Sequence, residues 1–203
     1  DAFPQDSTQW SDIDGDGFAE FAIGGPAIQS APRGGTPGGN GNGGAAFVFL
    51  SSSLPSPGSR FLTAEYSASV HLIGRNNAGG GYFGQSITGV EDMDGDGLAE
   101  VAVGAPWANV AGSKSGAIFV FTNAQINAAD IDSSGSGYIE SNAATYQLWG
   151  GATYHELGAD VSGAGDVDGD GLGDLLAGAE SDYGTSHGFG GAYLGLAATI
   201  SNN

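Results

Sequence analysis

Residues 92–106 of this 203-residue chain read DMDGDGLAEVAVGAP, and two other segments repeat the pattern. Residues 12–26 read DIDGDGFAEFAIGGP, and residues 166–180 read DVDGDGLGDLLAGAE. The three segments begin 80 and then 74 residues apart. Self-similarity at a long, nearly constant period indicates an array of related structural units.

The sequence on both sides of these acidic segments repeats as well. Phe3, Phe83 and Leu157 each stand nine residues before an acidic segment. A short apolar stretch follows each acidic segment, at residues 44–49, 116–121 and 190–195. The first copy carries eight extra residues within stretch 31–44, whose Gly/Pro-rich composition indicates a surface loop. It is not a domain linker, because the repeat continues on both sides of it.

Further apolar segments, 71–74 and 147–150, close the first two copies, whereas only residues 196–203 follow the last apolar stretch of the third. Four short strands per copy, with continuous apolar runs, are typical of propeller blades buried on both faces. We therefore expect an all-β fold of three four-stranded antiparallel blades. The array is expected to be incomplete as a closed propeller, and its third blade apparently lacks the last strand.

The repeat also predicts the domain organisation. Residues 1–203 form a single repeat array with no linker between units. Repeat 1 is expected to span residues 1–81, repeat 2 residues 82–155, and repeat 3 residues 156–203.

Composition narrows the class of protein. The chain has 39 glycines, 13% charged residues and 40% apolar residues, which suits many short strands joined by tight turns. Its 23 acidic residues against 4 basic ones give a net charge of −19, which argues against binding nucleic acid or anionic lipid. The absence of cysteine excludes disulfides and thiolate metal sites. There is no apolar run of about 20 residues, so no membrane span is expected.

Each acidic segment carries carboxylates at positions 1, 3, 5 and 9 and glycine at position 6. Calcium takes six to eight oxygen ligands from carboxylates, carbonyls and water, and glycine allows the backbone to curl around an ion. We predict about three Ca²⁺ per chain, each also bound by the carbonyl at position 7. The predicted ligands are Asp12, Asp14, Asp16, Phe18 and Glu20; Asp92, Asp94, Asp96, Leu98 and Glu100; and Asp166, Asp168, Asp170, Leu172 and Asp174.

A plain hairpin turn and a magnesium site are the alternatives to calcium. Asp-Gly-Asp-Gly is also typical of a plain hairpin turn, but three copies that each keep four acids favour a cation, because clustered carboxylates repel one another. Magnesium is disfavoured because it prefers small, water-rich octahedral sites.

Residues 130–140 form a weaker candidate loop, with acids at positions 1 and 3 but Tyr138 at position 9. Its alternative is a polar loop between two strands.

Catalysis is not expected from this sequence. None of His71, His155 and His187 belongs to a zinc signature or has an evident nucleophile partner, so we predict that the chain is not an enzyme. The tryptophans, Trp10, Trp107 and Trp149, fit packing between units better than a ligand face.

The repeat resembles the FG-GAP repeat, the blade unit of integrin α-subunit propellers and of many bacterial secreted proteins. Phe83-Gly84, the DMDGDGLAE loop and Gly104-Ala105-Pro106 match its three signatures. The first copy departs from them at Phe3-Pro4, and the third at Leu157-Gly158 and Gly178-Ala179-Glu180. The resemblance implies calcium in the turn between the first two strands of each blade. It also implies a secreted, extracellular or cell-surface location.

The family's propellers usually close with seven blades, so three blades imply a fragment or an assembly. We expect completion by self-assembly into a homo-oligomer, such as a ring or filament, with completion by further blades as the alternative. The expected role is structural or adhesive, with a possible protein or glycan ligand. The alternatives are an integrin-like ligand-binding module and the non-catalytic, calcium-stabilised portion of a secreted enzyme.

Overall fold

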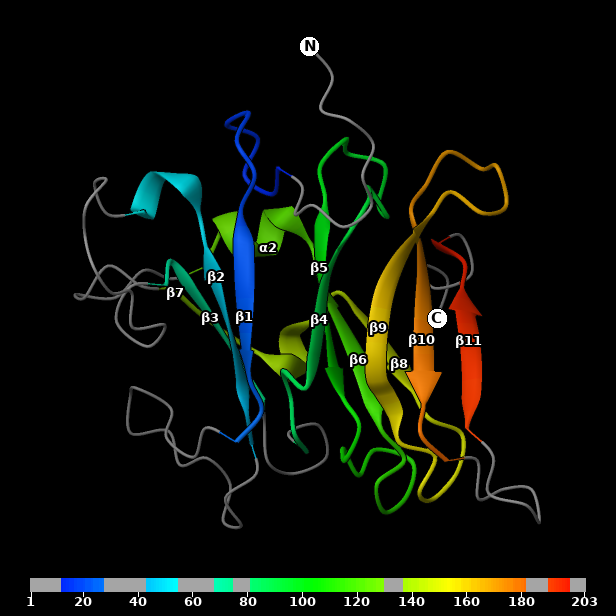
Figure 1. Cartoon of the computed structure of the whole chain (residues 1–203). Coiled ribbons are helices and arrows are strands. Elements are labelled where there is room, and N and C mark those ends of the chain that lie inside the picture. The colour runs from blue at the N-terminus through cyan, green and yellow to red at the C-terminus, as the bar shows by residue number, and fades with distance from the viewer. Residues whose placement is uncertain are drawn as a thin grey trace.

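The computed structural model describes residues 12–27, 43–54, 68–74, 81–129, 137–181 and 190–197. These residues form three sheets that stand side by side (Figure 1). Sheet 1 contains β1 (Phe21–Gly25), β2 (Ala45–Phe49), β3 (Val70–Ile73) and β7 (Gly137–Glu140). Sheet 2 contains β4 (Ser86–Val90), β5 (Glu100–Ala105), β6 (Ala117–Phe121) and β8 (Tyr146–Trp149). Sheet 3 contains β9 (Leu157–Gly165), β10 (Asp174–Ala179) and β11 (Gly191–Gly195).

Three short helical segments lie between strands in the described part of the chain: η1 (Ser51–Ser53), α2 (Asn123–Asn127) and η2 (Ser141–Ala143). The all-β expectation is therefore confirmed, and its antiparallel sheets are consistent with FG-GAP propeller blades. Sheet 2 has the four antiparallel strands that were predicted, in the order β4-β5-β6-β8. Sheet 3 has three strands among the described residues. No helix in the described ranges is both long and apolar enough to cross a membrane.

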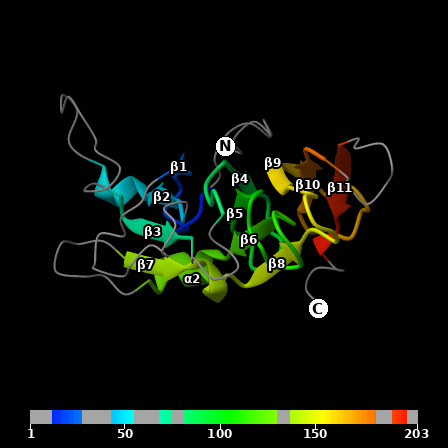
Figure 2. The ribbon, with the colours of Figure 1, turned by 90° about the horizontal axis from the view of Figure 1, so that it is seen from below.

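One part of the prediction was wrong. The segment expected as a polar loop between two strands of repeat 2 contains β7, which pairs in parallel with β3 of sheet 1, from Val70↔Gly137 to Ile73↔Glu140 (Figure 2). Ile139 of β7 and Ile126 of the preceding helix α2 are buried in the core between sheets 1 and 2, which draws this segment across to sheet 1. Sheet 1 is therefore not purely antiparallel. Residues 130–136 of the weaker candidate loop lie outside the described residues.

Sheet 2 is the central layer and is buried on both faces. Alternate residues of a strand point to opposite faces. Val101, Val103, Phe119 and Phe121 therefore face sheet 1, and Ala102, Ile118 and Val120 face sheet 3. All seven are 0–2% exposed. This burial explains why the strands of sheet 2 are apolar at successive positions rather than at alternate ones.

Glycine allows the sheets to approach at backbone distance. Phe83 bridges Gly44 of sheet 1, and Leu157 bridges Gly116 of sheet 2 in the same way. A Cβ atom on Gly24 would lie 2.1 Å from the carbonyl oxygen of Gly84. The repeat therefore builds the same inter-sheet contact twice, and each contact brings the backbone of one repeat against glycines of the preceding repeat.

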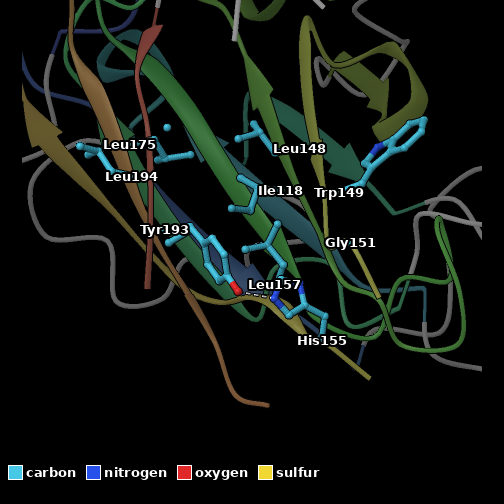
Figure 3. A pocket seen from close by; sticks show the side chains of 11 residues that line it. Ile118, Leu148, Trp149, Gly151, His155, Leu157, Leu175, Tyr193 and Leu194 are labelled. Carbon is cyan, nitrogen blue, oxygen red and sulfur yellow. Dashed lines mark hydrogen bonds between the residues drawn. The ribbon is translucent and has the colours of Figure 1, made fainter. Parts of the chain in front are cut away.

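A cavity accompanies the second contact, where repeat 3 carries smaller or more polar residues than repeat 2. Phe83, Phe119 and Phe121 of repeat 2 correspond to Leu157, Tyr193 and Gly195 of repeat 3, as the alignment of the acidic segments requires. A cavity of about 360 Å³ lies between sheets 2 and 3, and these three residues of repeat 3 all line it (Figure 3). The Tyr193 hydroxyl and His155 Nε2 form a hydrogen bond at its edge. Its other lining is mostly aliphatic, including Ile118 and Leu148.

Candidate metal centres

The three acidic loops lie at the same end of the array, at the top of Figure 1, where each leads into a strand: β1, β5 or β10. In each loop the glycines at positions 4 and 6 have positive φ angles, for example +87° at Gly95 and +90° at Gly97. Such angles favour glycine and turn the backbone sharply, so that successive N–H groups point into the loop. The local sequence therefore dictates the curled shape of the loop.

The carboxylate at position 1 is the centre of each loop. Asp92 Oδ1 accepts the N–H of Gly95 at 2.6 Å, and Asp92 Oδ2 accepts the N–H of Gly97 at 2.8 Å. The corresponding distances are 2.6 and 2.8 Å at Asp12, and 2.7 and 3.0 Å at Asp166. One carboxylate thus fixes positions 4 and 6 in all three loops.

The carboxylates at positions 3 and 5 form local turns. In the second loop Asp94 Oδ1 accepts the Asp96 N–H at 3.3 Å, and Asp96 Oδ1 accepts the Leu98 N–H at 3.0 Å. The other loops repeat both bonds at 2.9–3.1 Å. Side chains at alternate positions are therefore ordered by the loop's own backbone and keep further oxygen lone pairs for another partner.

The acid at position 9 is buried and joins the two ends of its loop. Glu20, Glu100 and Asp174 are 1%, 0% and 0% exposed. Each accepts the backbone N–H of position 2 in its own loop, at 2.6, 2.6 and 2.8 Å. Burial of a carboxylate requires such compensation, so this acid has a structural role whether or not it also binds an ion.

Burial and crowding make ionised carboxylates unfavourable in these loops. Loss of hydration is the main cause that raises the pKa of Glu100 to about 8; the nearby Asp94, Asp92 and Asp96 charges contribute to the rise, and the hydrogen bond from the Met93 N–H opposes it. Burial is also the main cause that raises the pKa values of Asp14, Glu20 and Asp94. Glu100 Oε1 has no hydrogen-bond partner among the described residues. A bound divalent cation would compensate these charges.

The structure brings most of the predicted acidic ligands together. One oxygen from each of Asp12, Asp14, Asp16 and Glu20 lies within 4.8 Å of the others. In the second loop the group is Asp92, Asp94 and Asp96, without Glu100. In the third it is Asp166, Asp168 and Asp174, without Asp170. The donor set is all oxygen, which fits a hard cation such as Ca²⁺. The residues whose carbonyls were predicted as ligands, Phe18, Leu98 and Leu172, occupy position 7 of these loops.

The loops also contact one another, which the sequence interpretation missed. The N–H of Ala99 donates to the carbonyl of Asp12 at 3.4 Å, and the N–H of Gly173 donates to the carbonyl of Asp92 at 2.7 Å. In both cases position 8 of one loop bonds to position 1 of the loop before it. The shape of each acidic loop is therefore coupled to the stacking of the sheets.

A second missed feature lies just after the third strand of each repeat. The Ser51 hydroxyl donates to Asp16 Oδ2, and Asn123 Nδ2 donates to Asp96 Oδ2 at 2.6 Å. The equivalent residue in repeat 3 is Ala197, whose backbone N–H donates to Asp174 Oδ1 at 2.9 Å. Each of these residues stands seven positions after the glycine that opens its apolar stretch. Extending the repeat alignment past the strand would have found them.

Comparison with known proteins assigns the repeat. Residues 83–121, which include the second loop, β4, β5 and β6, match the FG-GAP repeat. The chain contains an FG-GAP repeat. The match covers the repeat that agrees best with the three sequence signatures, and the other two repeats share its loop hydrogen bonds.

Integrin α subunits are similar to this chain. Integrin alpha-5 of Xenopus laevis is 33% identical over 110 residues, which is 54% of this chain and 9% of that protein. Integrin alpha-M of Mus musculus is 35% identical over 99 residues, 48% of this chain and 7% of that protein. Integrin alpha-PS2 of Drosophila melanogaster is 30% identical over 172 residues, 84% of this chain and 11% of that protein. The chain thus aligns with about a tenth of the length of these relatives.

Proposed function

We propose that this FG-GAP protein is a calcium-binding structural or adhesive module that acts outside the cell or at its surface. The single observation that carries this proposal is the threefold repetition of an all-oxygen carboxylate loop, with a buried acid at its base. The ions would be held by the acidic groups of the three loops. Each would neutralise carboxylates whose ionised form is otherwise penalised.

Calcium would act here as a clamp rather than as a catalyst. Each loop joins two strands or leads into one, and bonds between position 8 and position 1 connect neighbouring loops. An ion that fixes one loop therefore also fixes the contact between two sheets. The similarity to integrin α subunits supports an adhesive or ligand-binding role and an extracellular setting, where calcium is plentiful. A protein or glycan is the expected ligand.

Sheet 3 supports the proposal that other segments complete the array. Its outer face exposes Val167, Leu176 and Leu194 to 55%, 45% and 48%. The equivalent residues of repeat 2 are only 0–1% exposed, because sheet 3 covers them: Met93, Ala102 and Val120. We propose that a further sheet of the same type covers this face. The opposite face of the array differs, since Phe47 and Phe49 of sheet 1 are already buried, which favours further blades over simple stacking of identical copies.

Two alternative functions remain distinguishable from this one. A non-catalytic portion of a secreted enzyme would carry the same calcium loops beside a catalytic domain, whereas an integrin-like module would bind its ligand directly. We propose the non-enzymatic role because the acidic groups that recur in all three repeats, within the described residues, are those of the carboxylate loops, and an all-oxygen loop fits an ion better than a catalytic site. Binding assays with the full-length gene product would separate these alternatives, because an enzyme would turn over its ligand and an adhesive module would retain it.

Thermal unfolding and light scattering in calcium and in chelator test the proposal together. Ligand at 100 times its Kd stabilises the native state by about 2.7 kcal/mol per site, so calcium should raise the melting temperature by about 10 °C or more in a chain of this size. Magnesium at the same concentration is the control and should give a much smaller shift. Equal melting temperatures in calcium and chelator would contradict the clamp. A calcium-replete monomer at high protein concentration would exclude self-assembly, and further blades would then be the explanation for how the array is completed.

A further inference from the structure

We infer that the residue following the third strand of each repeat positions the carboxylate at position 5, and so makes the three cation sites unequal. This inference rests on the proposed function, since it concerns the affinity of the calcium loops. It assigns a role to Ser51, Asn123 and Ala197, which no sequence signature includes. It predicts that the third site is the weakest.

The first observation is the hydrogen bond from strand exit to loop. Position 5 acids use Oδ1 to accept a backbone N–H within their own loop, at Phe18 and Leu98. Their other oxygen, Oδ2, is held by the Ser51 hydroxyl in the first loop and by the Asn123 amide in the second. Both carboxylate oxygens are thereby fixed in direction, because rotation of the carboxylate would break one bond or the other.

The second observation is that the position-5 acid belongs to the acidic group in the first two loops, where it accepts this hydrogen bond, and not in the third. Asp16 and Asp96, whose Oδ2 atoms are held, belong to the clusters of their loops. Among the described residues, the Asp170 carboxylate of the third loop accepts one hydrogen bond, from the Leu172 N–H, and it lies outside the third cluster. Ala197 has no polar side chain that could reach Asp170, and only its backbone N–H takes part, donating to Asp174. The position-5 carboxylate therefore joins the group where a donor follows the third strand.

The helix α2 and the helical turn η1 explain why the donor reaches the loop. Asn123 is the first residue of α2 and is 4% exposed, so its amide is held close to Asp96. Thr122 caps this helix through a capping box with Gln125. Ser51 begins η1 at the equivalent place, and its N–H also donates to Glu20 Oε1 at 3.4 Å. A preorganised ligand loses less freedom on binding, which strengthens the site.

The test uses the full chain and follows calcium titration by NMR at the amides of Gly17, Gly97 and Gly171. Each amide donates to the position-1 carboxylate of its own loop, so each reports one site. In the unmodified chain we expect the amide resonance of Gly171 to shift at a higher calcium concentration than the resonances of Gly17 and Gly97. Asn123→Ala should weaken the site reported by Gly97 about tenfold, the equivalent of one hydrogen bond, and leave the site reported by Gly17 unchanged.

Three further variants keep the inference falsifiable. Asn123→Ser should restore most of the lost affinity, because a serine serves the first loop. Ala197→Asn should strengthen the third site about tenfold, and this gain does not depend on tolerance of a lost buried side chain. Asn127→Ala, on the exposed side of the same helix, is the matched control and should change no site.

The outcomes separate this inference from the function on which it rests. If no amide of the unmodified chain shifts with calcium, the proposed function fails. Suppose instead that all three amide resonances shift at the same calcium concentration, and that neither Asn123→Ala nor Ala197→Asn changes that concentration at any site. Calcium binding then stands, and the positioning role is overturned. An equal loss in Asn127→Ala would also overturn it, because the effect would then belong to the helix and not to the Asp96 contact.

Discussion

Gly84→Ala is expected to lower the free energy of unfolding by about 3–4 kcal/mol, one of the largest effects of any single methyl group in this chain. Gly84 has a φ of +86°, and a Cβ atom there would lie 2.3 Å from the carbonyl oxygen of Ala45 and 3.2 Å from the nitrogen of Gly25. Both neighbours are backbone atoms of sheet 1, so neither can move aside as a side chain could. Denaturant unfolding in the presence of calcium measures the loss.

Gly165→Ala is the matched control for this effect. Gly165 also has a positive φ, +68°, but its Cβ would meet only a Glu91 side-chain oxygen at 3.8 Å. Its cost should be limited to the conformational strain of about 1–2 kcal/mol. Equal losses in the two variants would show that strain alone explains Gly84, and that the contact between sheets 1 and 2 tolerates an added methyl group.

Asp92→Ala is expected to have an effect of similar size, through two separable causes. Asp92 accepts the N–H groups of Gly95, Asp96 and Gly97, so its removal unties the second loop even without calcium, at about 2–3 kcal/mol. In calcium the variant also loses the stabilisation supplied by the second ion, about 2.7 kcal/mol at 100 times Kd. Unfolding measured in chelator and in calcium gives the two terms separately.

Asp94→Ala isolates the loss of stabilisation by calcium from the loss of the loop's own hydrogen bonds. Asp94 accepts only the Asp96 N–H, at 3.3 Å, so its loss should scarcely change stability in chelator. In calcium, Asp94→Ala should lose the same stabilisation by the second ion that Asp92→Ala loses. If Asp94→Ala responds to calcium as strongly as the unmodified chain does, the second loop does not bind the ion through its acids.

Much of the fold could be predicted from the repeat because the repeat is a physical unit. The continuous apolar runs at Ala117–Phe121 predicted a strand buried on both faces, and β6 is covered by sheets 1 and 3. Gly104 belongs to one of the three repeat signatures, and the structure supplies a reason for glycine there, because a Cβ atom would lie 2.1 Å from the Gly158 carbonyl oxygen. Periodicity and glycine placement are local properties that a sequence displays directly.

What the sequence could not predict depends on contacts between repeats. β7 pairs with β3 across a repeat boundary, and nothing in Gly137–Glu140 alone names its partner strand. The bond from Asn123 to Asp96 spans 27 residues, and the Gly173 to Asp92 bond joins two different loops. Such pairings are set by how the sheets stack, so only the alignment of repeats and the structure together expose them.

The acids of the loops also separate what the sequence predicts from what the structure adds. Positions 1, 3 and 5 were predicted as equivalent ligands, yet position 1 is the one whose two oxygens both hold the loop backbone. Position 9 was predicted as a further ligand of the same kind, and the structure gives its buried carboxylate a hydrogen bond from the position-2 N–H in every repeat. Residue type and spacing identify a set of oxygens, whereas burial and hydrogen bonds distinguish their roles.

The most direct test of the account is the number of calcium ions bound per chain, measured by calorimetric titration of the chelator-treated protein. The loops predict about three, with Asp92→Ala and Asp94→Ala each binding one fewer. Fewer than two ions in the unmodified chain, or an unchanged number in both variants, would contradict the claim that these carboxylate loops are calcium clamps.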